Sequence, residues 1–166
     1  MKIFIASDHT GIELRETMIK ILKEEYSWEV IKSNVENNPT DDFSDFAFDI
    51  LLKANPQEDY CILICGNGIG MSIAANKVKG IYCARVVNEE EVIVAKGHNN
   101  INAIAFAAKT PISEAIKYVI ALVNTPKTQE EKRIRRNNKI AIYEEAKKWI
   151  IKHTYMCFLL CLVLLL

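Results

Sequence analysis

The sequence predicts an α/β fold in which a five-stranded parallel sheet carries helices on both faces. Short apolar runs alternate along the chain with amphipathic stretches that repeat apolar residues at helical spacing. The length of 166 residues suits one domain, and 50% of the residues are hydrophobic, which is enough for a core. The formal net charge is zero, so nothing indicates bulk attraction to nucleic acid or to a membrane.

Each element of this fold is expected from a particular stretch of sequence. The apolar runs predict strands over Lys2–Ala6, Trp28–Ile31, Tyr60–Ile64, Ile81–Val87 and Asn102–Ala108. The amphipathic stretches predict helices over residues 12–25, Phe43–Lys53, Ile69–Lys77, Glu89–Lys96, Ser113–Val123 and a long charged helix over Gln129–Lys152. Gly97 fits the end of the fourth helix, and Ser113 fits an N-cap. The Asn-rich segment 34–38 is expected to be a surface connection.

Ligands of parallel sheets bind beyond the carboxyl ends of the strands. That rule selects four segments of this chain: Ser7–Gly11, Cys65–Gly70, Val87–Glu91 and the turn near Lys109. The chemistry of a ligand site is therefore sought first among these residues.

The segment Cys65-Gly66-Asn67-Gly68-Ile69-Gly70 joins a predicted strand to a predicted helix. Its glycines permit a tight turn and a close backbone approach, and a helix start offers N–H groups to an anion such as a phosphate or an enediolate. The spacing differs from the dinucleotide fingerprint, so a nicotinamide cofactor is not expected. A turn that serves packing alone is the alternative interpretation.

Cys65 is one of 5 cysteines, and no pair of them has the spacing of a zinc site. Its place at a strand end, before a helix N-terminus, would favour a thiolate. A buried structural cysteine is the commoner interpretation of any single Cys, and Cys61 and Cys83 take it.

Two histidines fall at predicted junctions between strands and helices. His9 follows Asp8, which could orient it or cap the next helix, and His98-Asn99 closes the fourth helix. On the last helix, Lys132 and Arg136 lie one turn apart and could reach one phosphate, although a solvated face paired with acidic neighbours is the simpler interpretation.

Four segments together resemble ribose-5-phosphate isomerase B and its sugar-phosphate isomerase relatives. They read MKIFIASDHTGIELR, ICGNGIGMSIAANKVKGI, GHNNINAIAF and RRNNKI, and the resemblance covers roughly residues 1–145. It implies a Rossmann-like three-layer α/β/α domain over residues 1–152. It also implies a homodimer, or a tetramer built from it, with active sites at the subunit interface. The implied activity is aldose–ketose isomerisation through an enediolate in the pentose phosphate pathway, without metal or organic cofactor.

The resemblance also assigns roles to particular residues. One branch of the family uses a Cys as the base for the C2 proton, and another uses a Glu six residues later. This chain has Cys65 and Met71 at these positions, which places it in the cysteine branch. The resemblance implies that His98 opens the sugar ring. It implies that Asn67 is the third catalytic residue. The other implied contacts to the substrate come from Asp8, His9, Gly66, Gly68, Ile69, Gly70, Asn99, Lys109, Lys132 and Arg136.

Several positions depart from the family pattern. Asn67 stands where Thr or Ser is usual, Phe43 replaces a tyrosine, and Lys109 and Lys132 replace two arginines. Lysine keeps the charge but loses the bidentate fork, so weaker phosphate binding is expected. These changes leave two alternatives open: an isomerase of six-carbon sugar 6-phosphates, such as allose or galactose 6-phosphate, or a catalytically weak sugar-phosphate binding protein.

The chain ends are expected to carry no targeting function. The N-terminal MKIFIASDHTG has no signal-peptide pattern, which favours the cytoplasm and free thiols. Residues 153–166 form an apolar tail that is shorter than the about 20 residues a bilayer span needs. An incidental chain end, such as one read past a wrong exon boundary, is favoured over a membrane or partner contact.

Overall fold

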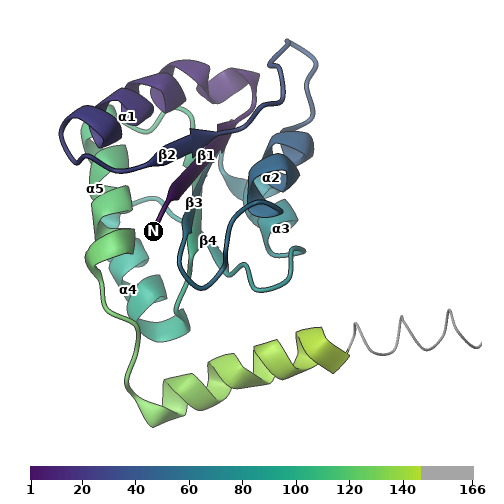
Figure 1. Cartoon of the computed structure of the whole chain (residues 1–166), viewed down its shortest axis with the longest axis vertical. Helices are drawn as coiled ribbons and strands as arrows, with labels where there is room; N and C mark the ends of the chain where they lie inside the picture. Colours follow the sequence, from purple (N-terminus) through teal and green to yellow (C-terminus); the bar gives the residue numbers. More distant parts are fainter. Residues whose placement is uncertain (147–166) are drawn as a thin grey trace, which may run out of the picture. The chain divides into compact units, whose positions relative to one another are not determined.

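A computed structural model describes residues 1–146. They belong to two compact units, and the boundary between the units in the sequence follows Thr128. The first unit contains, in order, β1 (Ile3–Ser7), the 3₁₀ turn η1 (His9–Gly11), α1 (Ile12–Glu24), β2 (Val30–Lys32), α2 (Phe43–Leu51), β3 (Tyr60–Cys65), α3 (Ile69–Ala75), β4 (Cys83–Arg85), α4 (Glu89–Asn99), β5 (Ala103–Ala107) and α5 (Ile112–Asn124) (Figure 1). The described part of the second unit is a helix over residues 131–146. The rest of the predicted long helix and the apolar tail 153–166 lie outside the described residues.

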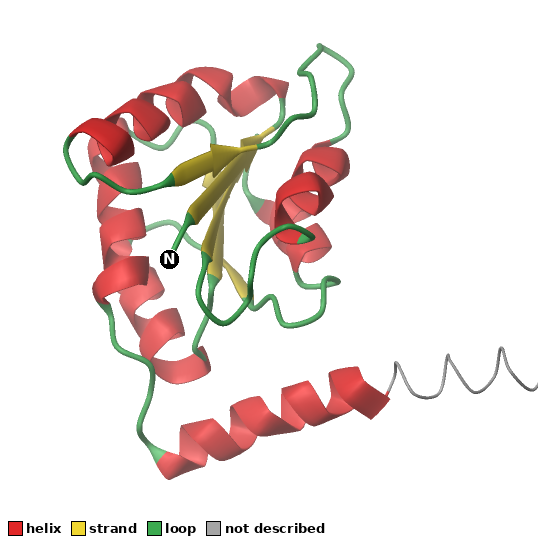
Figure 2. Cartoon of the chain, in the orientation of Figure 1, coloured by secondary structure: helices red, strands yellow, loops and turns green. Residues whose placement is uncertain are grey.

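The strands form one parallel sheet in the order β2-β1-β3-β5-β4. Figure 2 shows this sheet between two sets of helices. The predicted α/β class and the five parallel strands are therefore confirmed. The edge strands β2 and β4 have 3 residues each, whereas the central strands have 5 or 6.

Alternating side chains of the strands build two cores, one on each face of the sheet. On β3, Ile62 and Ile64 join the core that α1, α4 and α5 cover, and Leu63 joins the core under α2 and α3. Successive side chains of a strand point to opposite faces, so a strand that is apolar throughout must be covered on both. This explains why the central runs of the sequence are continuously hydrophobic.

Two helix boundaries differ from the prediction. α4 continues through Gly97 to Asn99, and the left-handed residue that follows it is Asn100, with φ of 53°. Asn100 N–H donates to the Lys96 carbonyl at 3.0 Å, so an asparagine provides the stop expected from glycine. Ser113 is not the N-cap of α5, because the helix already begins at Ile112 after Pro111.

Two buried polar side chains tie together the loops at the amino ends of the strands. The Asn102 amide donates to the carbonyls of Pro56 and Gly80 at 2.9 and 2.8 Å and accepts from Tyr82 N–H at 2.9 Å. Lys96 is only 1% exposed; its Nζ donates to the Ile101 carbonyl at 2.9 Å. These bonds fix the turn that connects α4 to β5.

Candidate active site

The strand order places a switch point between the carboxyl ends of β1 and β3. The two strands are neighbours, but α1 leaves β1 toward one face of the sheet and α3 leaves β3 toward the other. Ligands of open α/β sheets bind at such a switch in connection. The Asp8 N–H donates to the Ile64 carbonyl at 3.2 Å, which brings the segment after β1 beside the end of β3.

Cys65 is the last residue of β3 and lies at this switch point. Cys65 is only 4% exposed. Its carbonyl accepts a hydrogen bond of 2.8 Å from the N–H of Ala108, which follows β5. Lys109, the next residue, therefore belongs to the same edge of the sheet. Of the residues selected from the sequence, those around Asp8, Cys65 and Lys109 are thus brought to one edge.

The loop after Cys65 depends on two close contacts of its glycines. Gly68 has φ of 77°, and a β-carbon there would lie 2.7 Å from Phe106 Cα. A β-carbon at Gly70 would lie 2.7 Å from the Phe43 ring. The Phe43 side chain, which replaces the tyrosine of the family pattern, therefore lies directly against the loop. Met71, at the position of the other branch's glutamate, is fully buried.

Asn67 uses its side chain within the loop itself. Its Oδ1 accepts from Ile69 N–H at 3.0 Å, and its carbonyl accepts from Arg85 Nε at 3.3 Å. The Ile69 N–H, expected to serve a ligand, is therefore engaged by the Asn67 amide. Arg85 was missed by the sequence analysis; its only signal is a charge within the apolar run 81–87.

Asp8 and His9 form the first turn after β1. The Asp8 carboxylate accepts from Thr10 N–H at 3.0 Å and from its hydroxyl at 2.5 Å, so Asp8 caps the 3₁₀ turn. His9 instead contacts a residue distant in sequence: its Nδ1 lies 2.7 Å from Asp41 Oδ1. Asp41 was also missed, because it lies in a loop without a periodic pattern.

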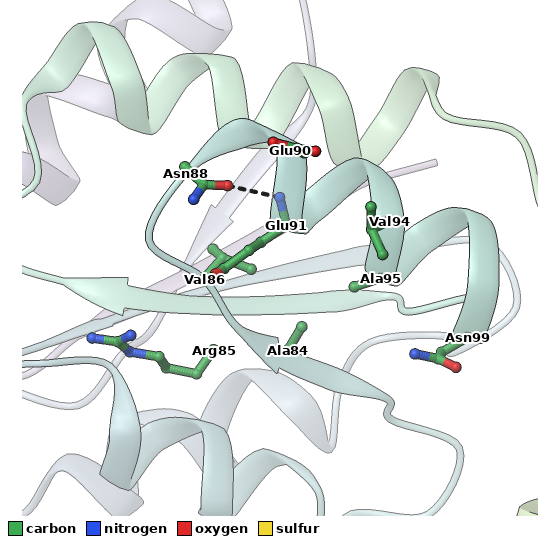
Figure 3. A pocket seen from close by; sticks show the side chains of 9 residues that line it. All are labelled: Ala84, Arg85, Val86, Asn88, Glu90, Glu91, Val94, Ala95 and Asn99. Atoms are coloured by element: carbon green, nitrogen blue, oxygen red, sulfur yellow. Dashed lines mark hydrogen bonds between the residues drawn. The ribbon is translucent and has the colours of Figure 1, made fainter.

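His98 and Asn99 lie at the opposite end of the sheet from Cys65. They end α4, which starts after the carboxyl end of β4 and returns to the amino end of β5. Within one chain the structure therefore does not bring His98 to Cys65. Figure 3 shows Asn99 at one end of a groove of about 470 Å³ along β4 and α4, with Arg85 at the other.

The remaining predicted phosphate ligands belong to the second unit. Lys132 and Arg136 are exposed on the helix over residues 131–146, one helical turn apart. A neighbouring basic residue, Arg133, forms an ion pair with Glu130, with Nε and Oε2 at 2.6 Å. Within residues 1–146, no group of three His, Cys, Asp or Glu residues could hold a metal ion, and no helix is long and apolar enough to cross a membrane.

Comparison with known proteins decides the family. The sequence model described as Ribose/Galactose Isomerase matches residues 3–140. The chain belongs to this isomerase family. It is 34% identical over 147 residues to a probable ribose-5-phosphate isomerase B of Mycoplasma pneumoniae, covering 87% of this chain and 96% of the relative.

Solved structures of ribose-5-phosphate isomerase B share the fold of this family member. The Mycoplasma genitalium structure, with bound ribulose-5-phosphate, has a TM-score of 0.80 and 37% identity and covers 87% of this chain and 96% of its own. The Clostridium thermocellum structure has a TM-score of 0.79 and 32% identity, and the match covers 89% of this chain and 99% of that structure's chain. The resemblance found in the sequence is therefore confirmed for both family and fold.

Proposed function

We propose that this family member interconverts ribose 5-phosphate and ribulose 5-phosphate, a reaction of the pentose phosphate pathway. The observation that carries the proposal is the position of Cys65 at the end of β3, at the switch point beside Asp8 and the glycine loop. The names of the relatives and the ribulose-5-phosphate bound in the Mycoplasma genitalium structure support this choice of sugar.

In the proposed mechanism, Cys65 acts as the base. With the sugar in its open aldehyde form, the thiolate removes the proton from C2, and the electron pair moves through a C1–C2 double bond onto the C1 oxygen. The enediolate then rearranges its hydroxyl proton from O2 to O1, and the thiol returns a proton to C1 to give the ketose. The Asn67 amide nitrogen and the backbone N–H groups of residues 66–70 other than Ile69 would stabilise the charge on the oxygens, as preorganised donors do in other enzymes.

A second copy of the chain is needed to complete this site. His98 is proposed to open the sugar ring and Asn99 to contact the sugar, yet both lie at the other end of the sheet from Cys65. Exposed apolar residues on α3 and α4, including Ile69, Ile73 and Val94, would be covered by such a partner. We therefore propose a homodimer in which one protomer supplies Cys65 and the other supplies His98 and Asn99.

The phosphate end of the substrate requires cations. His9 follows β1, and Lys109 follows β5 at the same edge of the sheet. Lys132 and Arg136 are proposed to add charge from the helix of the second unit. Compact ammonium groups attract phosphate without a bidentate fork. We expect a weaker phosphate affinity than an arginine pair would give.

A substrate panel on the wild type and on Cys65→Ala tests this function. We expect the wild type to turn over ribose 5-phosphate. In Cys65→Ala, kcat should fall by a factor of ~10²–10⁴, the usual contribution of a general base. Cys83→Ala, a change at a cysteine distant from the loop, should keep the activity. Equal rates in the wild type and Cys65→Ala would rule out this mechanism.

One observation favours a second candidate sugar. The Phe43 ring lies against Gly70 without offering a hydroxyl group, so the glycine loop has a different neighbour from the tyrosine of the family pattern. A higher kcat/KM on allose 6-phosphate or galactose 6-phosphate than on ribose 5-phosphate would select the six-carbon class. Tight binding without turnover would instead support a sugar-phosphate binding protein.

A further inference from the structure

The loop between β2 and α2, residues 33–42, folds back onto the carboxyl end of β1. The Asp41 side chain is only 3% exposed. Its Oδ1 accepts from His9 Nδ1 at 2.7 Å and from His9 N–H at 3.3 Å. Its Oδ2 accepts from the Asn37 amide at 3.1 Å and from Asn38 N–H at 3.2 Å. The carboxylate is thus held by four donors, two of them from His9.

The Asn37 amide is itself fixed in one orientation. Its Oδ1 accepts from the Arg15 guanidinium at 2.9 Å, so its nitrogen must be the donor to Asp41 and to the Ser7 carbonyl at 3.0 Å. Arg15 is buried under this loop. A chain of hydrogen bonds therefore runs from α1 through Asn37 and Asp41 to His9.

This arrangement determines which nitrogen of His9 can meet a ligand. Because a carboxylate only accepts hydrogen bonds, Nδ1 must carry the proton that points at Asp41. Nε2 is then left for a ligand, and the His9 side chain is 41% exposed. In the protonated ring Nε2 is a charged donor, which is the form a phosphate oxygen binds best.

We propose that Asp41 is a positioning residue that holds His9 as a cationic Nε2–H donor to the phosphate group of the substrate. This inference rests on the proposed sugar-phosphate isomerase function and assigns its phosphate end. It gives the β2–α2 loop a role in binding. A charge that His9 keeps to higher pH than a free imidazole would help to offset the loss of guanidinium groups at Lys109 and Lys132.

The electrostatics agree with the geometry. The hydrogen bond to Asp41 is the largest cause that raises the pKa of His9 above 6.5; slight burial opposes it, and the charges of Asp41 and Asp8 add to it. Burial by itself would raise the pKa of Asp41, but the hydrogen bonds from His9, Asn37 and Asn38 lower it below 3.8. The charges that act on the His9 ring, those of Asp41 and Asp8, are both negative.

The first measurement follows His9 by NMR in the intact protein, without any turnover. In Asp41→Asn the pKa of His9 should fall toward 6.5, and the resonances of the His9 ring should respond less to added inorganic phosphate at pH 7.5. Glu36→Gln, which removes an exposed carboxylate of the same loop, should leave both properties unchanged. An unchanged pKa of His9 in Asp41→Asn would overturn the inference whatever the substrate is.

The second measurement is kinetic. At pH 7.5, KM for ribose 5-phosphate should rise about tenfold in Asp41→Asn with little change in kcat, since one charge-assisted contact is weakened. The difference in KM between Asp41→Asn and the wild type should shrink toward pH 6, where His9 becomes protonated without a carboxylate beside it. Asp41→Glu should restore most of the affinity, and Asp41→Asn should add nothing in a His9→Gln background.

These readouts separate two kinds of failure. If the wild type is inactive on ribose 5-phosphate, the proposed function fails, but the titration of His9 with inorganic phosphate still judges the role of Asp41. If the wild type is active and Asp41→Asn has the wild-type KM at every pH, the positioning role is wrong. If Asp41→Asn does not fold, Asp41→Glu and His9→Gln test the role instead. Asp41→Glu should keep most of the affinity and His9→Gln should lose it, so equal KM values in these two variants would reject the role.

Discussion

Gly68 lies so close to Phe106 that a β-carbon at position 68 would stand 2.7 Å from Phe106 Cα and 2.8 Å from its nitrogen. The contact joins the loop after β3 to β5 near its carboxyl end. It fixes where the chain turns after Cys65, and it occurs at a left-handed backbone angle that favours glycine.

Gly68→Ala should therefore destabilise the protein and misplace the loop. The added methyl group meets backbone, which cannot rotate away, at a strained φ of 77°. We expect the free energy of unfolding to fall by roughly 2–5 kcal/mol in urea denaturation. Gly66→Ala is the matched control for stability, because a β-carbon there meets nothing within 4 Å. Equal losses in the two variants would contradict the packing argument.

Mixing two inactive variants tests whether the site is shared between protomers. In a mixed dimer of Cys65→Ala with His98→Ala, one site carries both defects and the other carries neither. After unfolding and refolding together, the mixture should recover roughly a quarter of wild-type activity, since half of random dimers are mixed and each has one intact site. No recovery, with dimers seen by size-exclusion chromatography, would place both residues in one protomer's site.

Asn102 should be among the most sensitive positions at the amino end of the sheet. Its amide pairs with three backbone groups of two different loops, at 2.8 to 2.9 Å. Asn102→Ala leaves buried backbone groups without a partner, so we expect a loss of about 2–5 kcal/mol in the free energy of unfolding. Asn124→Ala, on the exposed end of α5, should cost far less.

Lys96 should give the protein a distinctive alkaline pH dependence. Burial, with a contribution from Lys127, lowers the pKa of Lys96 to about 8 from 10.5. Between these values the unfolded chain binds more protons than the folded one, so folding stability rises with pH. Relative to Lys96→Met, the wild type should gain about 1 kcal/mol between pH 8 and 9.

Urea denaturation at the two pH values measures this difference. Other groups that titrate in the same range are present in both proteins and cancel in the comparison. Lys20→Met, a change of an exposed lysine on α1, should keep the wild-type slope. A parallel pH dependence of the wild type and Lys96→Met would show that Lys96 keeps its ordinary pKa in the folded protein.

Much of the fold follows from local pattern. The run Tyr60–Ile64 was expected to be a buried strand, and β3 extends it by one residue to Cys65. The rule for parallel sheets then placed Asp8, Cys65 and Lys109 at one edge without any knowledge of contacts. Such inferences succeed because hydrophobic periodicity and the direction of strands are properties of the chain itself.

Contacts between distant residues could not be predicted in the same way. His9 and Asp41 are separated by 32 positions, and the loop over residues 33–42 that carries Asp41 has no periodic pattern. The separation of His98 from Cys65 depends on where α4 ends relative to the sheet. Even the end of α4 was placed too early, because glycine is the usual left-handed residue and Asn100 takes that conformation here.

The attachment of Asp41 to the connection after β2 also has a consequence for how this enzyme can diverge. β2 is a short edge strand, and the loop over residues 33–42 can change in length or composition without disturbing the central strands. Cys65, by contrast, ends a strand buried on both faces. Selection can therefore retune recognition of the phosphate group through this loop while the chemistry at the carbonyl carbon stays the same, which separates the evolution of substrate preference from that of catalysis.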